Sequence, residues 1–177
     1  MSRILVIPGS LRASSSSNLI LKAIISFSPK DSDIEVCNAI GSLPHFNDPE
    51  KDPAQVIDFK KRIKQADAVL ICTPEYAFGI PGALKNALDW TVGSGEFLDK
   101  PVGIVTASSQ GEKAHSALHL VLTALSATII EDASLLISSV RATLDSEGKI
   151  KEKELEIKLR NVVPSLMDAV PRKINIF

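Results

Sequence analysis

A run of small and polar residues near the N-terminus has the composition of a phosphate-binding loop. Gly9 ends a short apolar run, and the segment from Ser10 to Asn18 contains five serines and Arg12. If this segment joins a strand to a helix, the free N–H groups of the helix start, the hydroxyls and the guanidinium would surround an anion. It has neither a Walker ending nor a G-x-G-x-x-G pattern, so a single terminal phosphate is expected. The alternative is a solvated serine-rich turn with a Ser or Asn helix cap.

A second unusual segment, 73–82, carries two prolines, two glycines and two aromatic residues directly after an apolar run. Prolines stiffen a loop, and glycines permit unusual dihedral angles or a close approach of the backbone. Such a loop suits a flat heteroaromatic ring, and the small polar segment 107–113 could supply N–H donors on the far side of that ring. The alternatives are that Tyr76, Phe78 and Trp90 are only core or interface aromatics, and that 107–113 is an ordinary capped connection.

The remaining titratable residues form no recognisable acid–base machinery. The three histidines, His45, His115 and His119, are scattered along the chain, and we interpret them as structural or surface residues. Glu75 and Asp89 could be interpreted as an acid pair. We expect Glu75 to brace its loop and Asp89 to make helix or subunit contacts.

The three loops need a parallel sheet to bring them together. Strands and helices alternate in the hydrophobic pattern, which predicts an α/β fold with helices on both faces of the sheet. Ligands of such sheets bind beyond the carboxyl ends of the strands, and the loops follow the first, third and fourth strands. The predicted strands are 4–8, 34–40, 68–72, 102–107 and 128–137. The predicted helices are 18–27, 54–65 with Val56, Ile57, Phe59 and Ile63 facing inward, 81–92, 114–125, and 152–167 with an interruption near Pro164.

Length, charge and cysteine content indicate the number of domains and the kinds of partner to expect. The 177 residues suit a single domain spanning 1–177, with 20 basic and 21 acidic residues and a formal net charge of −1. We therefore expect no nucleic-acid partner, which would require a basic excess. No segment approaches the roughly 20 apolar residues that span a bilayer, so no membrane association is expected. Cys37 and Cys72 form no metal-ligand cluster and lie in apolar runs, which favours buried thiols and a reducing, cytoplasmic location.

Two motifs carry a resemblance to a known family. They are GSLR at 9–12, followed by Ser-Asn at 17–18, and PEYAFGIPGALKNALDW at 74–90; LPHFND at 43–48 and SEGKI at 146–150 are weaker matches. Over nearly its whole length the chain resembles the NADPH-dependent FMN reductases, which are flavodoxin-like proteins. The resemblance implies a three-layer sandwich with a five-stranded parallel sheet of order 2-1-3-4-5 and helices on both faces.

The resemblance also implies an activity. FMN would be the cofactor, and NADPH or NADH the co-substrate. Hydride would pass to the flavin and then to a small-molecule electron acceptor, which is a free flavin, a quinone, an azo compound or a metal ion. A homodimer or homotetramer is implied, with the helix 82–92 and Trp90 near the interface. The alternative is a non-catalytic flavodoxin-type electron carrier or flavin-binding interaction protein, and such carriers are often strongly acidic. A phosphosugar or nucleotide-binding enzyme that shares only the phosphate loop fits the 73–82 segment poorly.

Site residues follow from the resemblance position by position. No side chain is expected to be catalytic, because the flavin carries the hydride chemistry. The family usually has Asn at position 77, so Ala77 removes a polar side chain beside the flavin, although its N–H group remains. The serine run is one residue longer than the common form, so Ser15 or Ser16 could replace Ser17 as a contact. The implied contacts are Ser10, Arg12, Ser15, Ser17 and Asn18 for the phosphate, Pro74, Glu75, Tyr76 and Ala77 along the isoalloxazine, and Ser108 and Gly111 near its other edge.

Overall fold

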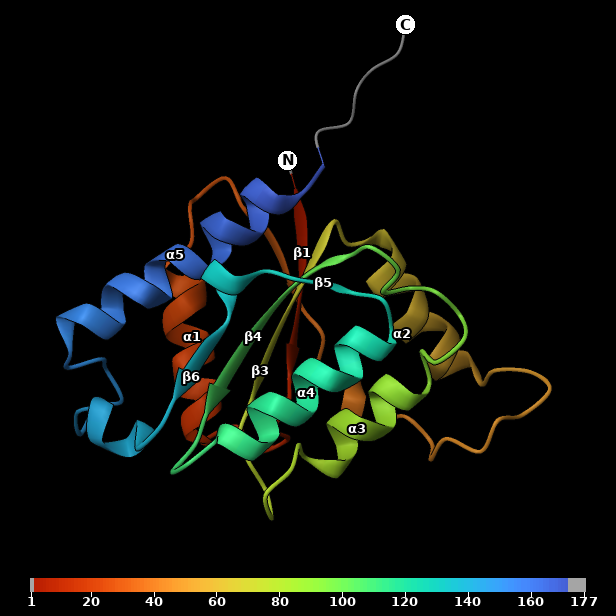
Figure 1. Cartoon of the computed structure of the whole chain (residues 1–177), viewed down its shortest axis with the longest axis horizontal. Helices are drawn as coiled ribbons and strands as arrows, with labels where there is room; N and C mark the ends of the chain where they lie inside the picture. Colours follow the sequence, from red (N-terminus) through yellow and green to blue (C-terminus); the bar gives the residue numbers. More distant parts are fainter. Residues whose placement is uncertain (1, 172–177) are drawn as a thin grey trace, which may run out of the picture.

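A single parallel sheet organises the chain in the computed structural model, which describes residues 2–171. Its strands run in the order β2-β1-β3-β4-β5, and a sixth strand, β6, also pairs with β4 (Figure 1). Every pairing is parallel. The predicted flavodoxin-like α/β fold and its strand order are confirmed, with one strand more than expected. The strands are β1 (Arg3–Pro8), β2 (Asp33–Val36), β3 (Ala68–Thr73), β4 (Pro101–Ala107), β5 (Thr128–Ile129) and β6 (Leu135–Ile137).

The two faces of the sheet carry different helices, as Figure 1 shows. One face is covered by α1 (Ser16–Phe27) and α5 (Lys153–Ala169), and the other by α2 (Ala54–Gln65), α3 (Gly82–Asp89) and α4 (Glu112–Ala124). Successive strand residues point to opposite faces, so Ile4 and Val6 pack with α1 and α5, whereas Leu5 and Ile7 pack on the other side. Both faces are buried, which explains the continuous apolar runs of the central strands. Among the described residues, no helix is long and apolar enough to cross a membrane.

Two predicted strands were wrong in extent. The strand 34–40 ends at Val36, where the Cys37 N–H still donates to Val6 O (2.8 Å) before a 3-10 turn at Ala39–Gly41. The strand 128–137 is two strands, divided by a 3-10 turn at Glu131–Ala133. This turn packs over Gly103 of β4, where an added Cβ atom would lie 2.9 Å from Ala133 O. The absence of a side chain at that point of β4 makes room for the turn.

Three helix predictions also needed correction. The helix 81–92 ends at Asp89, and turns follow with positive φ at Gly93 and Gly95. Pro164 does not interrupt the last helix, because the buried residues on either side of it hold α5 on the sheet as far as Ala169. Ile57 of α2 is 55% exposed, since Val56, Phe59 and Ile63 occupy the inward stripe at helical spacing.

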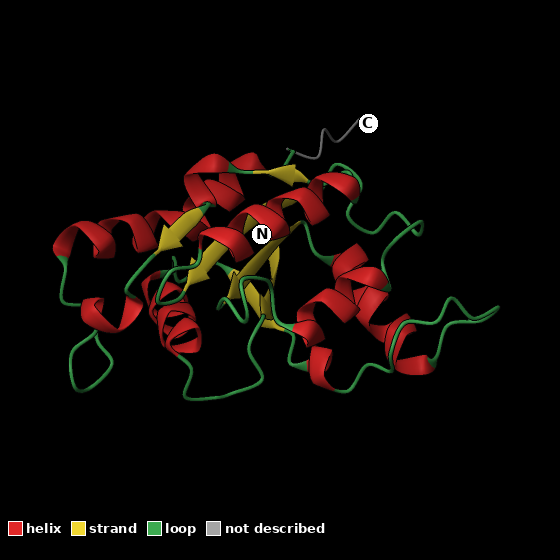
Figure 2. Cartoon of the chain, turned by 60° about the horizontal axis from the view of Figure 1, so that its bottom comes forward, coloured by secondary structure: helices red, strands yellow, loops and turns green. Residues whose placement is uncertain are grey.

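The loops singled out by the sequence leave the same edge of the sheet. The carboxyl ends of β1, β3 and β4 point toward the bottom of Figure 1, and Figure 2 brings this edge forward. The loops that leave these three strands start side by side there, because the strands are hydrogen-bonded neighbours. The edge predicted to bind a ligand therefore carries all three chemically unusual segments.

Candidate functional site

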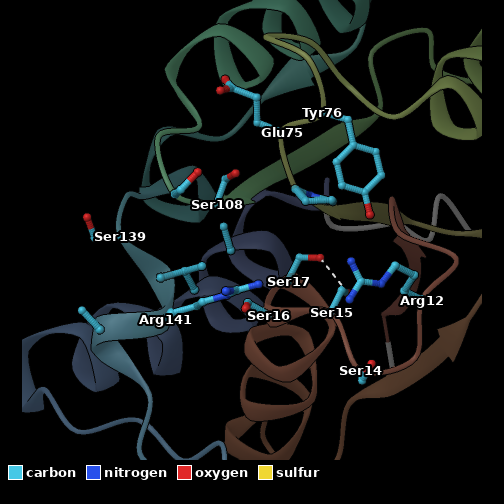
Figure 3. Close-up of a pocket in the computed structure, with 15 residues that line it drawn as sticks. Arg12, Ser14, Ser15, Ser16, Ser17, Glu75, Tyr76, Ser108, Ser139 and Arg141 are labelled. Carbon is cyan, nitrogen blue, oxygen red and sulfur yellow. Dashed lines mark hydrogen bonds between the residues drawn. The ribbon is translucent and has the colours of Figure 1, made fainter.

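A cavity of about 580 Å³ lies at this edge and is lined by four segments of the chain (Figure 3). Three are the predicted loops after β1, β3 and β4, and the fourth is 139–142, which follows β6. Ser14 and Ser16 also face the cavity. The predicted site residues in its lining are Arg12, Ser15, Ser17, Pro74, Glu75, Tyr76 and Ser108. The predicted site residues outside its lining are Ser10, Asn18, Ala77 and Gly111.

The start of α1 supplies backbone donors to the cavity. Ser15 is the N-cap, and its Oγ accepts from the Asn18 N–H (3.2 Å) and pairs with Ser17 Oγ (3.1 Å). The N–H groups of Ser16 and Ser17 lie in the first turn of α1 and have no intrahelical acceptor, so they carry the partial positive charge of the helix start. This is the geometry expected for an anion-binding helix terminus.

Ser10 and Asn18 hold the backbone of the first loop without lining the cavity. Asn18 Nδ2 donates to the carbonyls of Ser10 (3.3 Å) and Arg12 (2.8 Å), and Ser10 Oγ accepts from the Arg12 N–H (3.3 Å). Ser10 Oγ also lies 3.3 Å from Tyr76 Oη, which links the first loop to the second. The backbone of Arg12 is thus held, while its guanidinium makes no ion pair with any described residue and faces the cavity.

The first loop lies in close contact with the end of β3. The Gly9 N–H donates to Cys72 O (2.7 Å), and a Cβ atom added at Gly9 would lie 2.6 Å from Thr73 Cβ. Cys72 Sγ donates to Ser17 O (3.2 Å), and burial raises the pKa of this thiol to about 12, so it stays protonated. Cys37 is buried and free as well, as predicted for both thiols.

The second loop is a tight hairpin turn with a strained backbone. Tyr76 and Gly79 exchange N–H···O bonds of 2.9 and 3.0 Å around Ala77 and Phe78, whose φ angles are 48° and 61°. Positive φ at both central residues defines a type I′ turn, which normally favours Asn-Gly. The unusual dihedral angles of this loop fall on Ala77 and Phe78 rather than on its glycines, because neither Gly79 nor Gly82 has a positive φ. The turn leaves the Phe78 side chain 72% exposed.

This strain predicts that Ala77→Asn stabilises the protein. A left-handed backbone costs an ordinary L-residue about 1–2 kcal/mol, and Asn tolerates it better. We expect the free energy of unfolding to rise by about 0.5–1 kcal/mol in urea denaturation, within the range of compatible backbone substitutions. Ala124→Asn, at the exposed end of helix α4, is the matched control and should not stabilise. An unchanged or lower stability of Ala77→Asn would contradict the strain argument.

Glu75 fastens the second loop to α4, as predicted. Its Oε2 accepts from the Ala114 N–H (3.0 Å) in the first turn of that helix. Gly111 is the N-cap of α4 with φ 96°, and an added Cβ atom would lie 2.9 Å from a methyl group of Leu136. Gly111 therefore shapes the third loop without lining the cavity. His115 of α4 pairs through Nδ1 with Thr106 Oγ1 (2.9 Å), in keeping with the predicted structural role of the histidines.

The fourth segment was missed by sequence reasoning. Ser139 and Arg141 both line the cavity, and the Arg141 guanidinium makes no ion pair with any residue in the described range. Because a single strand was predicted over 128–137, the segment 139–142 was not placed beside the loops that form the site. The one available signal was a polar stretch with an arginine directly after a strand of the same sheet.

The donors around the cavity fit a phosphate monoester that is joined to a flat ring. Two unpaired guanidinium groups, serine hydroxyls and the N–H groups of α1 gather at one end. Pro74, Tyr76 and Ser108 line the cavity as well. A parallel sheet of order 2-1-3-4-5 with such a site defines the class of flavodoxin-like FMN-binding proteins.

Comparison with known proteins gives the family. The sequence model of the NADPH-dependent FMN reductases matches residues 2–142. An NAD(P)H-dependent FMN reductase of Pseudomonas aeruginosa is 31% identical over 176 residues, covering 95% of this chain and 92% of its own. A 2-hydroxy-1,4-benzoquinone reductase of a Burkholderia species is 34% identical over 157 residues, covering 84% and 85%. The structure of FerB, a flavoenzyme NAD(P)H:(acceptor) oxidoreductase of Paracoccus denitrificans, superimposes with a TM-score of 0.77 at 25% identity, covering 96% of this chain and 97% of its own. The chain belongs to the NADPH-dependent FMN reductase family.

Proposed function

We propose that this chain holds FMN in the 580 Å³ cavity and uses NADPH or NADH to reduce a small-molecule electron acceptor. The observation that carries the proposal is the convergence of the α1 helix start, two unpaired arginines and a stiff Pro-Glu-Tyr turn on one cavity. When bound, FMN supplies the hydride chemistry, and the protein supplies binding, orientation and electrostatics.

One set of residues binds the phosphate of FMN, and another lies along its ring. Arg12 and the N–H groups at the start of α1 bind the phosphate. The turn that follows Pro74 lies along the ring, braced by Glu75 on α4 and by the Tyr76–Ser10 contact. Because these braces are in place before a ligand arrives, little ordering is needed on binding.

The acceptor is proposed to be a quinone or an azo compound. Relatives of this chain include the 2-hydroxy-1,4-benzoquinone reductase and an NADPH azoreductase of a Bacillus species. Phe78 stands exposed beside Glu75 in a smaller hollow of about 260 Å³ that adjoins the main cavity. An exposed aromatic at this position suits stacking with a planar acceptor. Free flavins and metal ions are also proposed as acceptors.

We further propose a cytoplasmic homodimer or homotetramer. The exposed apolar side chains Val92, Leu98 and Leu120 lie on or beside helices α3 and α4, on the face where the predicted interface falls. Trp90 itself is 1% exposed and donates from Nε1 to Pro44 O (2.8 Å), so it would support an interface from within the chain. Light scattering at micromolar concentration tests this, and a monomer would contradict it.

Turnover with a defined acceptor tests the proposed function. We expect FMN-loaded protein to oxidise NADPH or NADH in the presence of 1,4-benzoquinone, with equal amounts of nicotinamide and quinone consumed. Protein freed of flavin should be inactive until FMN is restored. Absence of turnover with quinone, azo, flavin and ferric acceptors alike would favour the alternative, a flavodoxin-type electron carrier, and would overturn the proposal.

A further inference from the structure

Arg141 brings a second guanidinium group to the phosphate end of the cavity. It lies in the short 3-10 turn Val140–Thr143 that follows β6, outside every motif that indicated the site. In Figure 3 the side chains of Arg12 and Arg141 approach the serines at the start of α1 from opposite sides. Both line the same cavity, and neither has an acidic partner among residues 2–171.

The turn that carries Arg141 is fixed to the third loop. The Val140 N–H donates to Ser108 O (3.0 Å), and the Ser139 N–H donates to Ser109 O (3.0 Å). Ser138 Oγ adds a bond to the Gln110 carbonyl (2.7 Å). Arg141 is therefore carried by a backbone that is already positioned, rather than by a free loop. These hydrogen bonds join the segment that would face the flavin ring to the segment that carries Arg141.

Two unpaired guanidinium groups beside a helix start give the cavity a positive potential. The like charges repel one another, and an anion placed between them relieves that repulsion. A phosphate monoester carries about −1.5 to −2 charge at neutral pH, so it gains from both arginines. A ligand with the same ring and no phosphate gains nothing from either. The two arginines therefore favour a flavin that carries a phosphate over the same flavin without one.

We propose that Arg141 is a second phosphate-binding residue, which with Arg12 makes the site select FMN over riboflavin and retain it as a resident cofactor. This inference rests on the proposed function, because it presupposes that FMN occupies the cavity. It assigns to the 138–142 segment a role in ligand selection that is separate from the loop motifs at 9–18 and 74–90.

Equilibrium binding of FMN and of riboflavin tests this role without any turnover. Flavin-free wild type, Arg141→Gln and Arg141→Lys would be titrated with each ligand by fluorescence quenching, at low and at high ionic strength. Lys61→Gln, on the exposed side of α2, makes the same charge change away from the cavity and is the matched control. We expect Arg141→Gln to bind FMN at least about tenfold more weakly and to release it faster, as for loss of one charge-assisted contact. Riboflavin affinity should change by less than about threefold, within the scatter of such measurements.

The outcomes distinguish the proposed role of Arg141 from the proposed function of the chain. Arg141→Lys should lie between wild type and Arg141→Gln, because it keeps the charge and loses the planar fork. The salt dependence of FMN binding should be weaker in Arg141→Gln than in Lys61→Gln. Equal FMN affinity of wild type and Arg141→Gln, or an equal loss for FMN and riboflavin, would overturn the inference and leave the proposed function standing. Failure of wild type to bind FMN at all would overturn the proposed function itself.

Discussion

Replacing Arg12 by alanine should weaken FMN binding at least about tenfold while the fold stays intact. A charge-assisted contact to phosphate is worth roughly 1.5–3 kcal/mol, and each 1.4 kcal/mol is tenfold in affinity. The loop should keep its shape, because Asn18 and Ser15 hold the backbone carbonyl of Arg12, and its guanidinium makes no ion pair within residues 2–171. Isothermal titration with FMN measures the affinity, and urea denaturation of the flavin-free protein checks the fold.

The control for this variant is a second ligand, riboflavin, rather than a second substitution. Riboflavin lacks the phosphate, so its affinity should be the same for wild type and Arg12→Ala. Unchanged FMN affinity would remove Arg12 from the site. A parallel loss for riboflavin would mean that the guanidinium supports the ring instead of the phosphate.

Gly9→Ala should damage both the stability and the site, although it adds a single methyl group. The new Cβ atom would lie 2.6 Å from Thr73 Cβ and 3.0 Å from Thr73 Cα, so the first loop must move away from the end of β3. Overpacking of this kind costs about 1–3 kcal/mol. Moving the first loop away from the end of β3 also displaces the cavity-lining residues Arg12 and Pro74 relative to each other, which should lower FMN affinity by at least about tenfold, equivalent to about 1.4 kcal/mol.

Gly82→Ala is the matched substitution for this prediction. Gly82 begins helix α3, and no atom lies within 4 Å of the Cβ atom that would be added there. Its stability in urea denaturation should equal or exceed that of wild type, since Ala is the better helix former. Thr73→Gly introduced into Gly9→Ala should restore part of the FMN affinity by removing the clashing Cβ atom. If Gly9→Ala proves as stable as Gly82→Ala and binds FMN as wild type does, the close contact is not a constraint on the site.

The central elements of the fold were predictable because local pattern and burial agree there. Strands β1, β3 and β4 are buried on both faces, so their sequences are mostly apolar, and Gly9 follows β1, Pro74 follows β3 and Pro101 begins β4. Helix α2 was predicted at its observed bounds, since its apolar residues recur at helical spacing between Pro53 and Ala66. These signals depend on residues close together in the sequence.

The errors arose where distant contacts decide the conformation. The break between β5 and β6 depends on the turn that fits over Gly103, which lies about one helix earlier in the chain. The type I′ turn at Ala77 and Phe78 follows Glu75, which is hydrogen-bonded to α4, and neither central residue type favours positive φ. Arg141 was missed for the same reason, because only the folded sheet brings the end of β6 beside the end of β4.

An anaerobic absorbance trace tests the central claim most directly. Purified protein is loaded with FMN, freed of excess flavin, and mixed with an equimolar amount of NADPH or of NADH; a quinone is then added. We expect at least one nicotinamide to bleach the visible flavin band of the bound FMN and the quinone to restore it. A flavin band that persists in the presence of both nicotinamides would contradict the assignment of this chain as an NAD(P)H-dependent reductase.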